Sequence, residues 1–142
     1  MSEFVIDASA ALSWVLGSQS TAASVAFIEA RDGESFVAPH IFSWEVGNIL
    51  VGLYRRRRLS SNAYAKALSS LDALEIALQP ALAEAAIRDF GALATGLGLS
   101  LFDTAYLGLA IERDCGLVSR DDRLLAVARA RDVACVDLRG NG

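Results

Sequence analysis

Four acidic residues stand where their carboxylates could act together on one ligand. Asp7 and Asp121 follow short apolar runs, whereas Glu45 and Asp103 lie in the first turns of helix-like segments. Carboxylate oxygens are the donors that Mg²⁺ and Mn²⁺ prefer, and a metal ion can activate water near neutral pH. The residue types therefore indicate metal-assisted chemistry, provided that the fold brings the four side chains together.

Each acid also has a purely structural interpretation. Asp103 fits a capping box that begins at Ser100, and Asp122 fits one that begins at Ser119. Glu45 reads equally well as a solvated helix residue. Taken one at a time, the structural interpretation is the better one for Glu45, Asp103 and Asp122, and the two interpretations of Asp7 are level.

The sequence around two of these acids favours a shared ligand. Glu45 stands between Trp44 and Val46, and Asp103 follows Phe102. A charge in apolar surroundings is costly unless it is paired or bound to a cation. A cation shared by several carboxylates would remove that cost.

Strand-like and helix-like segments alternate along the chain. The pattern predicts strands over residues 4–6, 35–38, 75–78, 116–118 and 133–136. It predicts helices over residues 10–16, 21–31, 41–57, 63–74, 81–95, 101–114 and 123–131, with Pro39 and Pro80 at first helical turns. This alternation is typical of an α/β fold with a central, mainly parallel sheet flanked by helices.

The predicted fold places most of the acids on one rim. Ligands of open parallel sheets bind beyond the carboxyl ends of the strands, at a switch point. Asp7, Glu45 and Asp121 are expected at that edge because each follows a predicted strand or begins the helix after one. Asp103 does not follow a strand directly, so its placement stays open.

Length and composition indicate one globular domain, residues 1–142. The chain is 54% hydrophobic and 21% charged, which is typical of a folded protein. Its apolar stretches are all shorter than the roughly 18 residues of a membrane span. The N-terminal residues show no secretory signal, so a cytoplasmic location is the default expectation.

The charge pattern bears on nucleic-acid binding. A net charge of −4 argues against it, but residues 55–58 are four consecutive arginines. Cys115 and Cys135, with His40 as the single histidine, are too few for a zinc site and are expected to be reduced, buried thiols.

Four sequence motifs carry a resemblance to a known family. They are VIDAS at residues 5–9, EVGNIL at 45–50, SLFDTAY at 100–106 and LVSRD at 117–121. In order and spacing they resemble the PIN-domain proteins, and specifically the VapC-type ribonuclease toxins of bacterial toxin–antitoxin pairs. The resemblance covers nearly the whole chain.

The resemblance implies a sheet ordered 3-2-1-4-5 and a metal-dependent endoribonuclease that leaves a 3′-hydroxyl and a 5′-phosphate. The family's acids fall on Asp7, Glu45, Asp103 and Asp121, with Asp121 favoured over its neighbour. Glu45 would bind a second Mg²⁺ or Mn²⁺ or orient the attacking water, and both possibilities stay open. Two supporting positions also match, a hydroxyl and a side-chain amide: Ser119 and Asn48.

The resemblance also implies partners. The substrate would be RNA, with Arg120, Arg55 and Arg56 as possible contacts. The arginine run is equally explained as solvated cations at a helix C-terminus, about 15 Å along the helix from Glu45. A VapB-type antitoxin and a homodimer are expected. Core packing explains most of the apolar residues on the helix at 41–57, although a partner groove is the alternative.

Two other functions remain open. One is a PIN-like module that binds RNA or protein without cutting. The other is a receiver-like or phosphatase-like domain that uses Asp7, which is disfavoured because Lys66 is the only lysine and Ser9 stands where a phosphatase needs a second acid.

Overall fold

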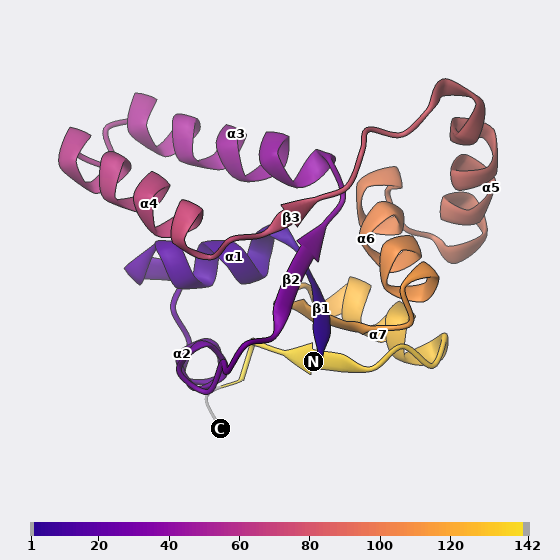
Figure 1. Ribbon diagram of the computed structural model, residues 1–142. Helices are drawn as coiled ribbons and strands as arrows, with labels where there is room; N and C mark the ends of the chain where they lie inside the picture. Colours follow the sequence, from indigo (N-terminus) through magenta and orange to yellow (C-terminus); the bar gives the residue numbers. More distant parts are fainter. Residues whose placement is uncertain (1, 141–142) are drawn as a thin grey trace.

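A five-stranded parallel sheet forms the centre of the computed structural model, which describes residues 2–140 (Figure 1). The strand order is β3-β2-β1-β4-β5, and all four pairings are parallel. The strands are β1 (Glu3–Ile6), β2 (Ser35–Ala38), β3 (Ala77–Leu78), β4 (Gly116–Ser119) and β5 (Cys135–Asp137). The predicted fold class and strand order are therefore confirmed.

Helices cover both faces of the sheet. One layer holds α1 (Ala8–Val15), η1 (Gly17–Gln19), α2 (Ala22–Glu29), α3 (Ile41–Arg55) and α4 (Ser61–Ala73). The other holds η2 (Glu84–Ala86), α5 (Ile87–Leu97), α6 (Leu101–Glu112) and α7 (Asp122–Ala130). Right-handed crossovers explain the division, because the chain moves from β1 towards β3 and later in the opposite direction from β4 to β5.

The register of the two central strands sets the position of the site. Val5 pairs with Leu117 and Ile6 pairs with Val118, and all four side chains are fully buried. The ends of β1 and β4 are therefore level. The backbone N–H of Asp7 continues the ladder by donating to the Val118 carbonyl at 3.2 Å, so the residues that follow both strands meet at one edge.

The segment after β3 departs from the prediction. A helix was predicted over residues 81–95, but residues 79–83 are not helical, and the chain turns through η2 into α5. Pro80 therefore does not begin a helix. Ala81–Ala83 instead lines a surface pocket beside α3 and α6.

The apolar residues of α3 divide into two groups. Phe42 and Leu50 are buried in the core, as simple packing predicts. Trp44 is 69% exposed and Tyr54 is 42% exposed, so core packing does not account for them. The helix ends at Arg55, two residues before the predicted end, because Arg57 adopts a positive φ of 58°.

The cysteines and the helix lengths bear on two further predictions. Cys115 and Cys135 are both free thiols, half-buried rather than fully buried. Across residues 2–140, no single helix has the length and apolarity to cross a membrane; only η2–α5 and α6 taken together, across a 99° bend, reach them.

Candidate active site

Asp7 lies at the junction of β1 and α1, where it caps the helix. Its Oδ1 accepts hydrogen bonds from the backbone N–H of Ala10 and the hydroxyl of Ser9, both at 2.8 Å. Its Oδ2 accepts from the Ser119 hydroxyl at 2.5 Å. An aspartate is a preferred N-cap because its carboxylate satisfies a free N–H of the first turn. The side chain is thus fixed by the fold while only 5% exposed.

The environment of Asp7 opposes its ionisation. Burial raises the pKa of this carboxyl to about 6, although the hydrogen bonds from Ser119, Ala10 and Ser9 act in the opposite direction. The negative charge of Asp121 raises the pKa further. A buried carboxyl with a shifted pKa at the edge of a parallel sheet is typical of a functional site.

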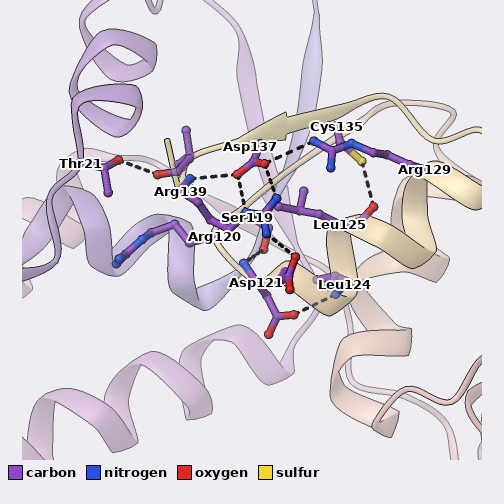
Figure 2. A network of polar contacts seen from close by, with 12 residues as sticks. Thr21, Ser119, Arg120, Asp121, Leu124, Leu125, Arg129, Cys135, Asp137 and Arg139 are labelled. Carbon is purple, nitrogen blue, oxygen red and sulfur yellow. Dashed lines mark hydrogen bonds and ion pairs between the residues drawn. The ribbon is translucent and has the colours of Figure 1, made fainter. Parts of the chain in front are cut away.

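Asp121 caps α7 on the other side of the same edge. Its Oδ1 accepts from the backbone N–H of Leu124 at 2.8 Å, and its own N–H donates to the Ser119 hydroxyl at 2.8 Å (Figure 2). The predicted capping box, with Ser119 as N-cap and Asp122 as its partner, is therefore wrong. Ser119 is the buried last residue of β4, and exposed Asp122 pairs with Arg139 instead.

Ser119 and Ser9 join the two strand ends. Ser119 Oγ bridges the carboxylate of Asp7 and the backbone of Asp121, and Ser9 Oγ bridges Asp7 and the backbone N–H of Arg120. The hydroxyl at position 119 was singled out from the sequence, whereas Ser9 was not given a role. Its position two residues after Asp7 was the available signal.

Glu45 is held by a residue that sequence reasoning did not single out. The Tyr106 hydroxyl, on α6, donates to Glu45 Oε1 at 2.6 Å. Tyr106 is 1% exposed, and Glu45, on α3, is half-buried. Burial raises the pKa of Glu45 and the charge of Asp103 raises it further, while the hydrogen bond from Tyr106 lowers it.

Asp103 lies in the first turn of α6, and its environment connects it to the other acids. Its backbone N–H donates to the Ser100 hydroxyl at 3.0 Å, which caps the helix. Burial raises the pKa of Asp103, and the nearby charge of Asp121 raises it further. Arg123 acts in the opposite direction. The position that the sequence left open is thus close enough to Asp121 for their charges to interact.

The charges of the four carboxylates interact in series, but the four groups do not enclose a metal site. Asp7 interacts with Asp121, Asp121 with Asp103, and Asp103 with Glu45. Within residues 2–140, no three acidic, histidine or cysteine side chains are arranged to hold a metal ion. The all-oxygen donor set suits Mg²⁺ or Mn²⁺, and a cation would relieve the repulsion among the acids.

The remaining candidate residues lie outside this group of four acids. Asn48 is exposed and makes no side-chain hydrogen bond within the described part of the chain, so its supporting role stays a prediction. Arg120 reaches towards Gln19 at 3.4 Å, away from the Asp121 carboxylate (Figure 2). Its Nε is buried without a hydrogen-bond partner. Arg55 and Arg56 are exposed at the end of α3.

This geometry, with acids at the carboxyl edge of a 3-2-1-4-5 parallel sheet, defines an α/β fold with a candidate site at its switch point. The PIN domain model matches residues 4–130, and the chain belongs to the PIN domain family. No curated protein matches the chain significantly. A similar solved structure is that of PAE2754 from Pyrobaculum aerophilum. It is 22% identical over 95% of this chain and 90% of that one, with a TM-score of 0.65, which supports the fold alone.

Family membership has a coarse functional consequence. PIN domains are generally nucleases, a class of hydrolase, and they typically use divalent metal ions. The acids at the carboxyl edge of the sheet are the residues of this chain that suit such chemistry.

Proposed function

We propose that this chain is a Mg²⁺- or Mn²⁺-dependent endoribonuclease. The observation that carries the proposal is a series of four acids, from four separate elements, whose charges interact. The pKa is raised for three of these acids. Acids that repel one another in a partly buried site are costly to the fold unless a cation joins them. The presence of four such acids together therefore supports a role in binding a metal ion.

Asp7, Asp103 and Asp121 would be the main ligands of the ion. Bound metal would supply a lowered pKa for the attacking water and would neutralise charge that develops on the phosphate. Asp7 is fixed by three hydrogen bonds and Asp121 by its place at the N-terminus of α7, so both are oriented before any ligand arrives. Glu45 would bind a second ion or orient water, and Tyr106 holds its carboxylate at the site.

Basic side chains would hold the RNA backbone beyond the acids. Arg55 and Arg56 are exposed at the end of α3. The length of this helix separates them from Glu45 by a distance that several nucleotides of RNA would span. Arg120 is less favourable than the sequence suggested, because its guanidinium is directed towards η1. We retain all three as proposed RNA contacts.

We further propose that the nuclease is the toxin of a type II toxin–antitoxin pair and acts in the cytoplasm as a homodimer. The support is the resemblance of its four motifs to VapC-type toxins. A VapB-type antitoxin would then be its inhibitory partner. Growth arrest on expression, relieved by Asp7→Asn or by the product of a small neighbouring gene, is the expected result; unimpaired growth would contradict the toxin role.

The enzymatic proposal is tested by incubating total cellular RNA with the purified chain. Cleavage is expected with Mn²⁺, and not with EDTA or in the Asp7→Asn variant. Mapped ends should carry a 3′-hydroxyl and a 5′-phosphate. Cleavage that survives EDTA would rule out the metal-dependent mechanism.

One observation favours a second function, a module that binds RNA or protein without cutting. The described carboxylates are not arranged as a ready metal site. Absence of both Mn²⁺ binding in calorimetry and RNA cleavage would support this alternative. A receiver-like or phosphatase-like role stays disfavoured, because Lys66 is the only lysine and Ser9 stands where a phosphatase needs a second acid.

A further inference from the structure

An apolar pocket opens on α3 and α6, the two helices that carry Glu45 and Asp103. It has a volume of about 550 Å³ and lies between the start of α3, residues 79–83 and helices α5 and α6. Trp44 and Phe102 contribute aromatic surface, and His40 and Gln79 contribute polar groups. A mostly apolar hollow of this size with a few polar groups is typical of a small-ligand site.

The pocket and the acids share two helices at adjacent positions. Trp44 of the pocket directly precedes Glu45 on α3, and Phe102 of the pocket directly precedes Asp103 on α6. Neighbouring residues of a helix differ by only 1.5 Å along its axis and point in diverging directions. The aromatic surface and the two carboxylates therefore lie on adjoining faces of the same two helices.

The aromatic side chains are unusually exposed for their size. Trp44 is 69% exposed and Phe102 is 51% exposed. Exposed aromatic side chains next to a nucleic-acid site commonly stack on unpaired bases, because every base has a planar face. Packing within the described residues leaves about half or more of each side chain uncovered.

The charge of the lining residues limits the kind of ligand that the pocket can bind. Glu112 lines the pocket, and none of its described lining residues is lysine or arginine. A phosphate would be repelled there, whereas an uncharged ring could stack on Trp44 and accept or donate hydrogen bonds at His40 and Gln79. The concave shape also suits an inserted ring.

We propose that this pocket binds one unpaired nucleobase of the RNA strand whose phosphate lies at the acids. The inference rests on the proposed ribonuclease function and adds a base-recognition subsite to it. The substrate is accordingly single-stranded at the cut, because a base inside a duplex cannot enter the pocket.

The test measures binding rather than cleavage. Fluorescein-labelled RNA octamers are titrated by anisotropy against the full chain carrying Asp7→Asn, in Mg²⁺, so that the strand stays intact. One series contains a single abasic position moved along the octamer. One abasic position should weaken binding by about 5- to 150-fold, and Trp44→Ala should weaken intact RNA similarly and abolish the abasic effect. Quenching of tryptophan fluorescence by intact RNA should also disappear with Trp44→Ala.

Ile111→Ala is the matched control, because Ile111 is an exposed apolar residue of α6 outside the pocket. Its affinity for RNA should equal that of the parent. Equal binding of intact and abasic octamers would overturn the inference. The inference would also be overturned if Trp44→Ala kept the abasic effect but changed the protein from a dimer to a monomer. The surface around Trp44 would then join two copies of the chain.

The outcomes separate this inference from the enzymatic proposal. Metal-dependent cleavage without an abasic effect would remove the pocket's role and leave the nuclease intact. An abasic effect that depends on Trp44, in a chain that never cleaves RNA, would retain the pocket in a binding module.

Discussion

The Ser119 hydroxyl donates a 2.5 Å hydrogen bond to Asp7, a residue 112 positions away in the sequence. The same oxygen accepts the backbone N–H of Asp121, so one buried hydroxyl positions two of the acids. Its place at the end of β4, level with the end of β1, follows directly from the pairing of the central strands.

Ser119→Ala should lower the free energy of unfolding by about 1–3 kcal/mol, because it removes the donor to Asp7 Oδ2 and the acceptor of the Asp121 backbone N–H. It should also raise the pKa of Asp7, since this hydrogen bond holds that pKa down. Urea denaturation across a pH series measures both effects. Ser43→Ala, at an exposed serine of α3, is the control. A variant as stable as the parent would contradict the bridging role.

Asp7→Asn should make the metal-free protein more stable at neutral pH. The folded-state pKa of about 6 exceeds the unfolded value of about 3.9, so the folded state binds more protons between these limits. The contribution of Asp7 to stability therefore falls as pH rises through this window, by about 3 kcal/mol at most. Urea denaturation in EDTA should show Asp7→Asn gaining stability over the parent above pH 6 and little below pH 4.

The control for that measurement is Asp72→Asn, at an exposed aspartate of α4. Its difference from the parent should not change over the same pH range. A parent protein whose stability rises from pH 4 to 6 relative to Asp7→Asn would show that the Asp7 carboxyl is stabilised as an anion by the fold.

Divalent metal should stabilise the chain in a manner that depends on the acids. A ligand that binds only the folded state adds about 2.7 kcal/mol at a hundredfold excess over its Kd, which is several degrees of Tm for a domain of this size. Mn²⁺ should therefore raise the Tm of the parent, and EDTA should reverse the rise. Asp7→Asn should show little shift. An equal shift in both proteins would place the bound ion elsewhere.

Tyr106→Phe should separate the positioning of Glu45 from the packing around it. The ring remains, but the 2.6 Å hydrogen bond to Glu45 is lost, which should cost about 1–3 kcal/mol at pH 7. The loss should shrink at acidic pH, where a protonated carboxyl is the weaker acceptor. Denaturation at pH 7 and pH 4 checks this. Tyr54→Phe, whose exposed hydroxyl is 3.3 Å from Ser61, should be neutral at both.

Asp121→Asn and Asp122→Asn should differ sharply in activity. Asparagine remains a good N-cap, so Asp121→Asn should preserve α7 while removing a proposed metal ligand, with at least a hundredfold loss of cleavage expected. Asp122 is exposed and pairs with Arg139, so its replacement should change the cleavage rate less than threefold. Rates measured on one RNA, with circular dichroism for folding, decide between them. A reversed order would reassign the fourth acid.

The sequence predicted the sheet and the position of several acids because both depend on local patterns. Each strand is a short apolar run, and chain order determines which edge the residues after it occupy. Asp7 and Asp121 were therefore expected on one rim. Spacing also suggested Ser119 as an N-cap, but pairing with Asp137 of β5 keeps that residue in the strand, and the cap is Asp121.

Long-range partners were beyond the sequence. Nothing near Tyr106 indicates that its hydroxyl contacts a residue 61 positions earlier, because that contact depends on how α3 and α6 converge at the sheet edge. The predicted helix includes residues 81–83 wrongly, because local apolar spacing cannot distinguish a helix face from a pocket wall.

The hydrogen bond between Tyr106 and Glu45 has a dynamic consequence, since α3 and α6 belong to opposite helical layers of the sheet (Figure 1). It links the two layers, so a fluctuation that moves α6 away from the sheet must first break the hydrogen bond to the Glu45 carboxylate on α3. The amides of these two helices would then exchange with solvent as one cooperative unit, although the chain separates them by a strand and three other helical segments.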